Sequence, residues 1–218
     1  MSPGPADRLL GYLRTKLWSQ AQLPDPERLH RQGGTFLVCA HLLQCWSPDR
    51  TKEILSRYGA DIHPEAWPVG PNVTIHEAGR DFSNLSIGAF SHVGRQVFLD
   101  LTDRVIIEES VSVGMRAVIL THLNVGEYPG KPVAKLMPKK HAPTVLRRGC
   151  SVGAGSVILC GVEVGEDAVI GAGVVVDRNV PAGTIVTSSH HKADYQIPER
   201  MLEKARAALE RTDEHHDH

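Results

Sequence analysis

The sequence predicts a mainly β protein built from short, stacked strands, and three observations lead to this fold class. Aliphatic residues recur every six positions from Leu146 to Val176. Each is followed four places later by a small or β-branched residue, from Cys150 to Val180. Glycine often comes directly after the aliphatic residue, as at Gly153. Because side chains of a strand alternate between faces, each six-residue unit is expected to be one strand with two inward side chains and a glycine-assisted corner. A helix would need a period near 3.6.

The same period occurs upstream. The inward positions expected there are Leu101, Val105, Ile107, Val111, Val113, Ala117, Ile119 and Leu123, preceded by Val69, Ile75, Ile87, Val93 and Leu99, with Asp81 as the one failure. The phase slips by two between Leu99 and Leu101, which is typical of a bulge. It slips again across residues 124–145, which we expect to form an extruded loop.

Composition narrows the class of protein. The chain has 218 residues, a net charge of −1, 20 glycines and only 5% aromatic residues. This charge indicates neither a nucleic-acid nor a membrane partner. The four cysteines lack C-x-x-C spacing, so reduced thiols are expected. No apolar leader or membrane-length run is present, and a cytoplasmic protein without a membrane span is expected.

The two ends of the chain differ from the repeat and are expected to be helical. Residues 1–68 form a helical N-terminal segment in this interpretation, in which Ser47 caps a helix, Pro48 opens it and Gly59 ends it. Residues 187–218 are expected to form a capping helix and a disordered tail. The β-solenoid would occupy residues 69–186.

The stretch "SVGAGSVILCGVEVGEDAVIGAGVVVDRNVPAGTIV" (151–186) resembles the left-handed parallel β-helix, or hexapeptide-repeat, acyltransferases. The resemblance implies three hexapeptides per coil and a left-handed winding. It also implies a homotrimer with active sites between subunits, acetyl-CoA or another acyl-CoA as co-substrate, and no metal. A small-molecule or glycan acceptor would complete the reaction.

Thr121-His122, followed by the extruded loop, resembles the sugar O-acetyltransferase and xenobiotic acetyltransferase branches of that family. The matching histidine in those branches is the catalytic base. His122 holds the fourth place of its hexad, so its side chain is expected to point outward rather than into the core. A neutral imidazole could take a proton from an acceptor hydroxyl and return it to the departing thiolate.

Other site residues follow from the same resemblance. Ala172 and Arg178 in "IGAGVVVDR", together with Ala154, align with coenzyme A contacts of galactoside-type enzymes. Asp100 and Asn124 are candidate acceptor contacts. The asparagine-rich stretch of the sugar enzymes is missing, so a simple sugar is not expected as acceptor.

The stretch from Tyr128 to Val162 contains no acidic residue. Its basic residues are Lys131, Lys135, Lys139, Lys140, Arg147 and Arg148. They could attract phosphates of coenzyme A, or the stretch could simply be a solvated loop.

The leading interpretation is an acyl-CoA-dependent O-acyltransferase, of the acetyltransferase type, acting on a hydroxyl of a sugar, glycan or secondary metabolite. An N-acyltransferase acting on an amino sugar and a non-catalytic solenoid for binding or assembly remain alternatives. A zinc carbonic anhydrase would need histidines that converge from adjacent coils. His76, His92 and His122 occupy different places of their hexads, so they are expected to project in different directions.

Overall fold

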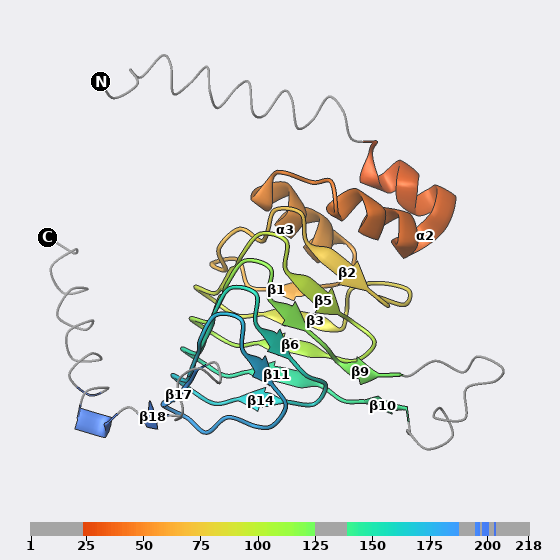
Figure 1. Cartoon of the computed structure of the whole chain (residues 1–218). Coiled ribbons are helices and arrows are strands. Elements are labelled where there is room, and N and C mark those ends of the chain that lie inside the picture. The colour runs from red at the N-terminus through yellow and green to blue at the C-terminus, as the bar shows by residue number, and fades with distance from the viewer. Residues whose placement is uncertain (1–23, 125–138, 188–194, 197, 201–202, 204–218) are drawn as a thin grey trace, which may run out of the picture.

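The computed structural model of this chain describes residues 24–124, 139–187, 195–196, 198–200 and 203. Most of the expected C-terminal helix and tail, and residues 125–138 of the expected loop, lie outside the described residues. The described part is a three-sided stack of short strands with two helices at its N-terminal end (Figure 1).

The helices α2 (Pro26–Leu42) and α3 (Pro48–Arg57) begin as their sequences predict. The Asp25 carboxylate caps α2, and the Ser47 hydroxyl accepts the backbone N–H of Arg50 at 3.3 Å to cap α3. Apolar side chains of both helices, such as Val38 and Ile54, are buried in the same core as the strands, so the helices cover one end of the stack (Figure 1). No helix among the described residues is both long and apolar enough to cross a membrane.

Three sheets form the sides of the stack. Sheet A comprises, in spatial order, β1 (Asp61–Ile62), β3 (Leu85–Ile87), β6 (Val105–Ile107), β11 (Thr144–Leu146) and β14 (Glu163–Val164). Sheet B comprises β18 (Tyr195–Gln196), β17 (Thr184–Val186), β15 (Val169–Ile170), β12 (Ser151–Val152), β7 (Ser112–Val113) and β4 (His92–Val93). Sheet C comprises β16 (Val175–Val176), β13 (Val157–Ile158), β8 (Val118–Ile119), β5 (Phe98–Asp100) and β2 (Thr74–His76). Sheet A begins with β1, upstream of Val69, where the sequence placed the start of the solenoid.

The chain visits sheets C, A and B in turn, so one coil contributes one strand to each sheet. Neighbouring strands of successive coils are parallel, and among the described strands of these three sheets only β18 pairs in the antiparallel direction. In the most regular part, Val152 lies beside Ile170 and Ile158 beside Val176, which gives 18 residues, or three hexads, per coil. The parallel β-helix architecture is therefore confirmed. The left-handed sense of its winding stays a prediction.

The inward positions read from the sequence form the core. From Leu146 to Val180, both inward residues of every hexad are buried, including the polar Ser156. Glycine allows the coils to approach closely at a corner, since a Cβ on Gly153 would lie 2.5 Å from the backbone nitrogen of Ala172. Leu123, predicted to point inward, is instead 47% exposed. The chain has left the coil there to form β9 (His122–Leu123), which pairs with β10 (Lys140–His141).

Two isoleucines on strand β6 test this account of the core. Ile107 is buried at 1% exposure and Ile106 is partly exposed on the other face. Ile107→Ala should therefore lower the free energy of unfolding by about 2–5 kcal/mol, because it leaves a cavity in the stack. Ile106→Ala should cost much less. Urea unfolding of both variants measures the difference, and equal losses would contradict the assignment of inward and outward faces.

Candidate active site

Departures from the regular coil gather at one edge of the stack, where sheet C passes to sheet A. Residues 77–84 are inserted between β2 and β3, and residues 101–104 carry the two-residue slip between β5 and β6. The long segment between β8 and β11 leaves from the same edge one coil later. Because the coils are stacked, side chains at the ends of β2, β5 and β8 lie one above another. We call this edge, from His76 through Asp100 to His122, the C/A edge.

Asp100, the last residue of β5, lies at the centre of the C/A edge and is fully buried. Its Oδ2 accepts the backbone N–H of Thr121 at 2.7 Å and that of His122 at 2.9 Å. Its Oδ1 accepts the Thr102 hydroxyl at 2.7 Å and the Thr102 backbone N–H at 3.1 Å. Burial by itself would raise the pKa of Asp100, but these hydrogen bonds, the Thr102 hydroxyl first among them, outweigh it and lower the pKa to about 2.

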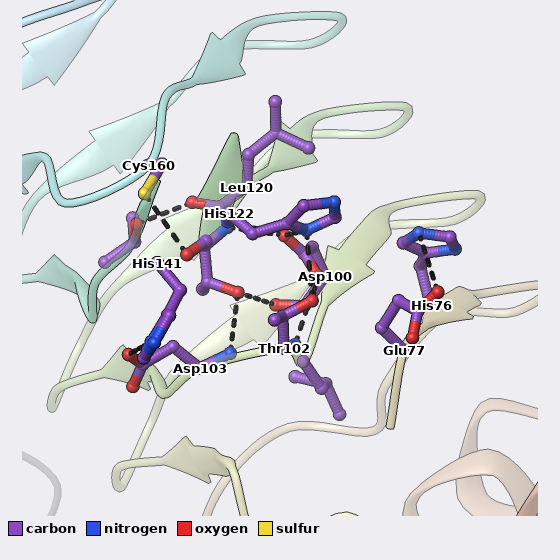
Figure 2. A network of polar contacts seen from close by, with 12 residues as sticks. His76, Glu77, Asp100, Thr102, Asp103, Leu120, His122, His141 and Cys160 are labelled. Atoms are coloured by element: carbon purple, nitrogen blue, oxygen red, sulfur yellow. Dashed lines mark hydrogen bonds and ion pairs between the residues drawn. The ribbon is translucent and has the colours of Figure 1, made fainter. Parts of the chain in front are cut away.

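His122 is oriented by that carboxylate (Figure 2). Its Nδ1 lies 2.6 Å from Asp100 Oδ2 and 3.0 Å from the Thr102 hydroxyl. An ionised carboxylate only accepts hydrogen bonds, so Nδ1 must carry the proton and donate it. The neutral ring then has its lone pair on Nε2. The side chain is 25% exposed, as expected for an outward residue near the surface.

The turn that carries His122 is fixed from below and above. The buried Thr121 hydroxyl donates to the Asp100 carbonyl at 2.9 Å and accepts the Asp103 backbone N–H at 3.0 Å. The Thr121 carbonyl accepts the Cys160 thiol at 3.2 Å from the following coil. His141, opposite His122 in the β9–β10 ribbon, pairs with Asp103 at 2.9 Å. These contacts hold the His122 backbone, so the imidazole is preorganised rather than free to swing.

His76 is a further residue of the C/A edge, and sequence reasoning placed it wrongly. Its ring stacks on that of His122 with centroids 5.7 Å apart, although the two were expected to project in different directions. The expectation failed because Asp100 Oδ2 binds both the backbone N–H and Nδ1 of His122, which holds the His122 ring beside β5 and its neighbour β2. His92 lies on sheet B, away from this edge. Among the described residues, no group of three or more histidine, cysteine, aspartate or glutamate side chains could hold a metal ion.

The two residues expected to contact the acceptor, Asp100 and Asn124, differ in their exposure. Asp100 does come next to His122, but direct contact with an acceptor does not fit a carboxylate that is buried and hydrogen-bonded through both oxygens. Asn124 is exposed at the end of the β9 strand. The sequence offered one signal for the Asp100–His122 pair, namely the two-residue slip directly after Asp100.

Two of the expected coenzyme contacts, Ala154 and Ala172, lie at another edge, where sheet B passes to sheet C. Ala154 and Ala172 are exposed there in successive coils, joined by a hydrogen bond from the Gly173 backbone N–H to the Ala154 carbonyl at 2.9 Å. We call this the B/C edge. Arg178, by contrast, follows β16 at the corner between sheets C and A, and is exposed beside an open depression of about 450 Å³. Its guanidinium lies 3.4 Å from the Asp177 carboxylate.

Arg147, one of the cations considered for phosphate binding, is already engaged. Its guanidinium lies between Glu108 at 2.7 Å and Glu163 at 2.9 Å, on the outside of sheet A. The hydrogen bonds that Arg147 donates to Glu163 and Glu108 raise the pKa of Arg147, and the same contact with Arg147 lowers the pKa of Glu163. This Glu108–Arg147–Glu163 cluster joins three successive coils on sheet A.

The Asp100 hydrogen bonds predict a specific pH dependence of stability. The pKa of Asp100 is about 2 in the folded protein against 3.8 for an ordinary aspartate. The unfolded chain therefore binds the proton first, so the stabilisation is complete above about pH 4 and is lost as the pH falls towards 2. Carbon-13 NMR of the carboxyl measures the midpoint directly. Thr102→Val should raise the midpoint and Thr102→Ser should leave it low; equal midpoints in these two variants would contradict the assignment.

Comparisons with known proteins agree with this fold. Residues 143–178 match the family described as bacterial transferase hexapeptide (six repeats). Over 144 residues the chain is 29% identical to serine acetyltransferase of Buchnera aphidicola, covering 66% of this chain and 41% of that protein. Over 62 residues it is 36% identical to 2,3,4,5-tetrahydropyridine-2,6-dicarboxylate N-acetyltransferase of Staphylococcus aureus, covering 28% of this chain and 26% of that protein. The chain thus spans less than half the length of either curated relative.

Among solved structures, a hexapeptide-repeat acetyltransferase of Vibrio cholerae complexed with acetyl coenzyme A has a TM-score of 0.58 at 20% identity, covering 79% of this chain and 87% of that one. Galactoside acetyltransferase in complex with coenzyme A has a TM-score of 0.54 at 20% identity, covering 68% and 69%. At such identities the likeness shows the fold. The repeat match over residues 143–178 and the 18-residue coils agree with that fold.

Proposed function

We propose that this protein is an acyl-CoA-dependent O-acyltransferase, of the acetyltransferase type, with His122 as its general base. The observation that carries the proposal is the contact between His122 Nδ1 and the buried Asp100 carboxylate at 2.6 Å. It fixes the tautomer that leaves Nε2 able to accept a proton. Such a histidine–carboxylate pair is the arrangement that activates a hydroxyl for attack on an acyl group.

The reaction follows from the two ring nitrogens. His122 Nε2 takes the proton of the acceptor hydroxyl while the hydroxyl oxygen forms a bond to the thioester carbonyl carbon. The ionised Asp100 stabilises the imidazolium that results. As the carbon–sulfur bond breaks, His122 returns the proton to the departing thiolate, so the products are the acyl ester and the free thiol of coenzyme A. After the reaction the His122 ring is again neutral and Asp100 is again ionised.

The B/C edge suits the narrow arm of an acyl-CoA. Ala154 and Ala172 carry no atom beyond Cβ, and the glycines that follow them, Gly155 and Gly173, have positive φ angles with open space where a side chain would be. A thin chain can therefore approach the backbone closely there. Arg178 is exposed after β16, at the corner between sheets C and A, and offers a cation for phosphate groups. These three residues, Ala154, Ala172 and Arg178, are the coenzyme contacts that we propose.

His122 lies at the C/A edge, whereas Ala154 and Ala172 lie at the opposite edge of sheet C, so a site that combines them needs more than one copy of the chain. The outer face of sheet C carries a row of residues in register across neighbouring strands, namely Phe98, Val118, Val157 and Val175. All are apolar, and Val175 is 62% exposed. If three copies turn this face towards a threefold axis, the C/A edge of one copy meets the B/C edge of the next. We therefore propose a homotrimer with a site at each junction.

An amine acceptor is a second candidate, because the Staphylococcus aureus relative is named an N-acetyltransferase. The same histidine would deprotonate an ammonium or the attacking amine. Measuring thiol release from acetyl-CoA against matched alcohols and amines separates the two. Faster transfer to the amines throughout would replace the O-acyl proposal.

Replacing the base tests the mechanism. His122→Ala should lower kcat at least about 100-fold, because proton removal by a positioned base contributes about 10²–10⁴. Coenzyme A binding, measured by calorimetry, and the circular dichroism spectrum should remain unchanged. His92→Ala, which removes an exposed histidine from sheet B, is the matched control. A near wild-type rate in His122→Ala would remove this residue from the mechanism.

The proposed assembly has its own test. Val118→Glu places a charge in the apolar row of sheet C and should convert trimers to single copies in light scattering, with loss of acyl transfer. Ser112→Glu makes the same change on an exposed strand position of sheet B and should leave both unchanged. A single-copy Val118→Glu protein with full activity would show that each copy contains its own complete site.

A further inference from the structure

We infer that His76 sets acceptor specificity, by hydrogen-bonding a second polar group of the acceptor next to the hydroxyl that His122 deprotonates. This inference rests on the proposed function and deepens it. The register of β2 and β5 places His76 directly beside Asp100. The imidazoles of His76 and His122 are nearly parallel, at 21° and 5.7 Å between centroids, and both lie on the same side of the strands (Figure 2).

The polar atoms of His76 are available to a ligand. The ring packs between His122 and Phe98, whose centroids both lie 5.7 Å away. Its Nε2 is 3.8 Å from the Glu77 carboxylate, too far for a hydrogen bond, and none of the described residues hydrogen-bonds to the ring. The side chain is 46% exposed. By contrast, His122 is bound to Asp100 and His141 is bound to Asp103 at 2.9 Å.

The spacing of the two rings suits an acceptor with neighbouring polar groups. Each imidazole nitrogen reaches an oxygen at about 2.8 Å, so oxygens held by rings 5.7 Å apart can be about 3–6 Å from each other. That range covers hydroxyls on adjacent carbons and on carbons one further apart. A monofunctional alcohol would reach His122 but leave His76 without a partner.

The charge around His76 defines what the second group can be. Glu77 is 64% exposed beside it, and the ionised Asp100 lies one strand away. These carboxylates would repel a carboxylate or phosphate on the acceptor. A hydroxyl can both donate to and accept from imidazole, and an amine can donate to it and to Glu77. The acceptor class that fits is therefore a diol, polyol or amino alcohol.

Acceptor pairs that differ by one hydroxyl test the inference. The wild-type enzyme is assayed by thiol release from acetyl-CoA with methyl hexopyranosides and their monodeoxy analogues, and with 1,2-diols and the matching mono-alcohols. Loss of the neighbouring hydroxyl should lower kcat/KM about tenfold, the effect of one lost hydrogen bond of about 1.4 kcal/mol. His76→Phe keeps the aromatic stack but removes both nitrogens. In this variant the kcat/KM for the diols should fall to that for the mono-alcohols, because the KM for the diols rises. The kcat for the mono-alcohols should not change.

The control variants separate this inference from the proposed function. His76→Asn retains a hydrogen-bond donor and should keep part of the preference for diols over mono-alcohols. This variant keeps the inference testable even where His76→Phe does not fold. Undiminished discrimination in His76→Phe, or an equal loss for all acceptors, overturns the specificity role while leaving a His122-dependent transferase. Wild-type protein that acylates none of these compounds, or a fully active His122→Ala variant, overturns the proposed function and this inference with it.

Discussion

The buried carboxylate of Asp100 is the group on which the candidate site depends. A carboxylate without solvent is unfavourable unless donors surround it, and here the donors come from two places. Thr102 belongs to the turn that follows Asp100, whereas Thr121 and His122 belong to the next coil. The charge is therefore fully stabilised only when the two coils are stacked in register. The same interaction that joins the coils also orients the His122 ring, so folding fixes the orientation of the proposed base.

Stacking also explains why the unusual residues share one edge. Parallel strands of neighbouring coils lie about 4.8 Å apart, and an extra residue inside a strand would break every hydrogen bond beyond it. Extra residues are tolerated at corners, where the chain turns between sheets. In this protein the segments 77–84, 101–104 and 120–143 all use the corner between sheets C and A. The B/C edge keeps its glycines and alanines, and the two edges thus differ in the chemistry they can offer.

Much of the fold could be predicted because the repeat is local. A period of six and alternation along each strand identify Leu146, Ile158 and their equivalents as core without knowledge of any contact. The site could be predicted only in part. His122 was found from its motif, but its contact with Asp100 depends on how far one coil is shifted against the next. The prediction that Leu123 points inward was wrong for a related reason, because the chain leaves the coil there and β9 pairs with β10. His76 was missed because stacking of distant side chains leaves no local pattern.

The Glu108–Arg147–Glu163 cluster has a consequence for how this architecture can vary. Glu108 lies one coil before the long segment that leaves the stack, whereas Arg147 and Glu163 lie in the two coils after it. The Arg147 guanidinium therefore connects strands of sheet A that precede and follow the long segment between β8 and β11. Coils on either side are thus held together independently of the polypeptide that links them. A change in the length of that linking segment would therefore leave the ion pairs of Arg147 with Glu108 and Glu163 in place.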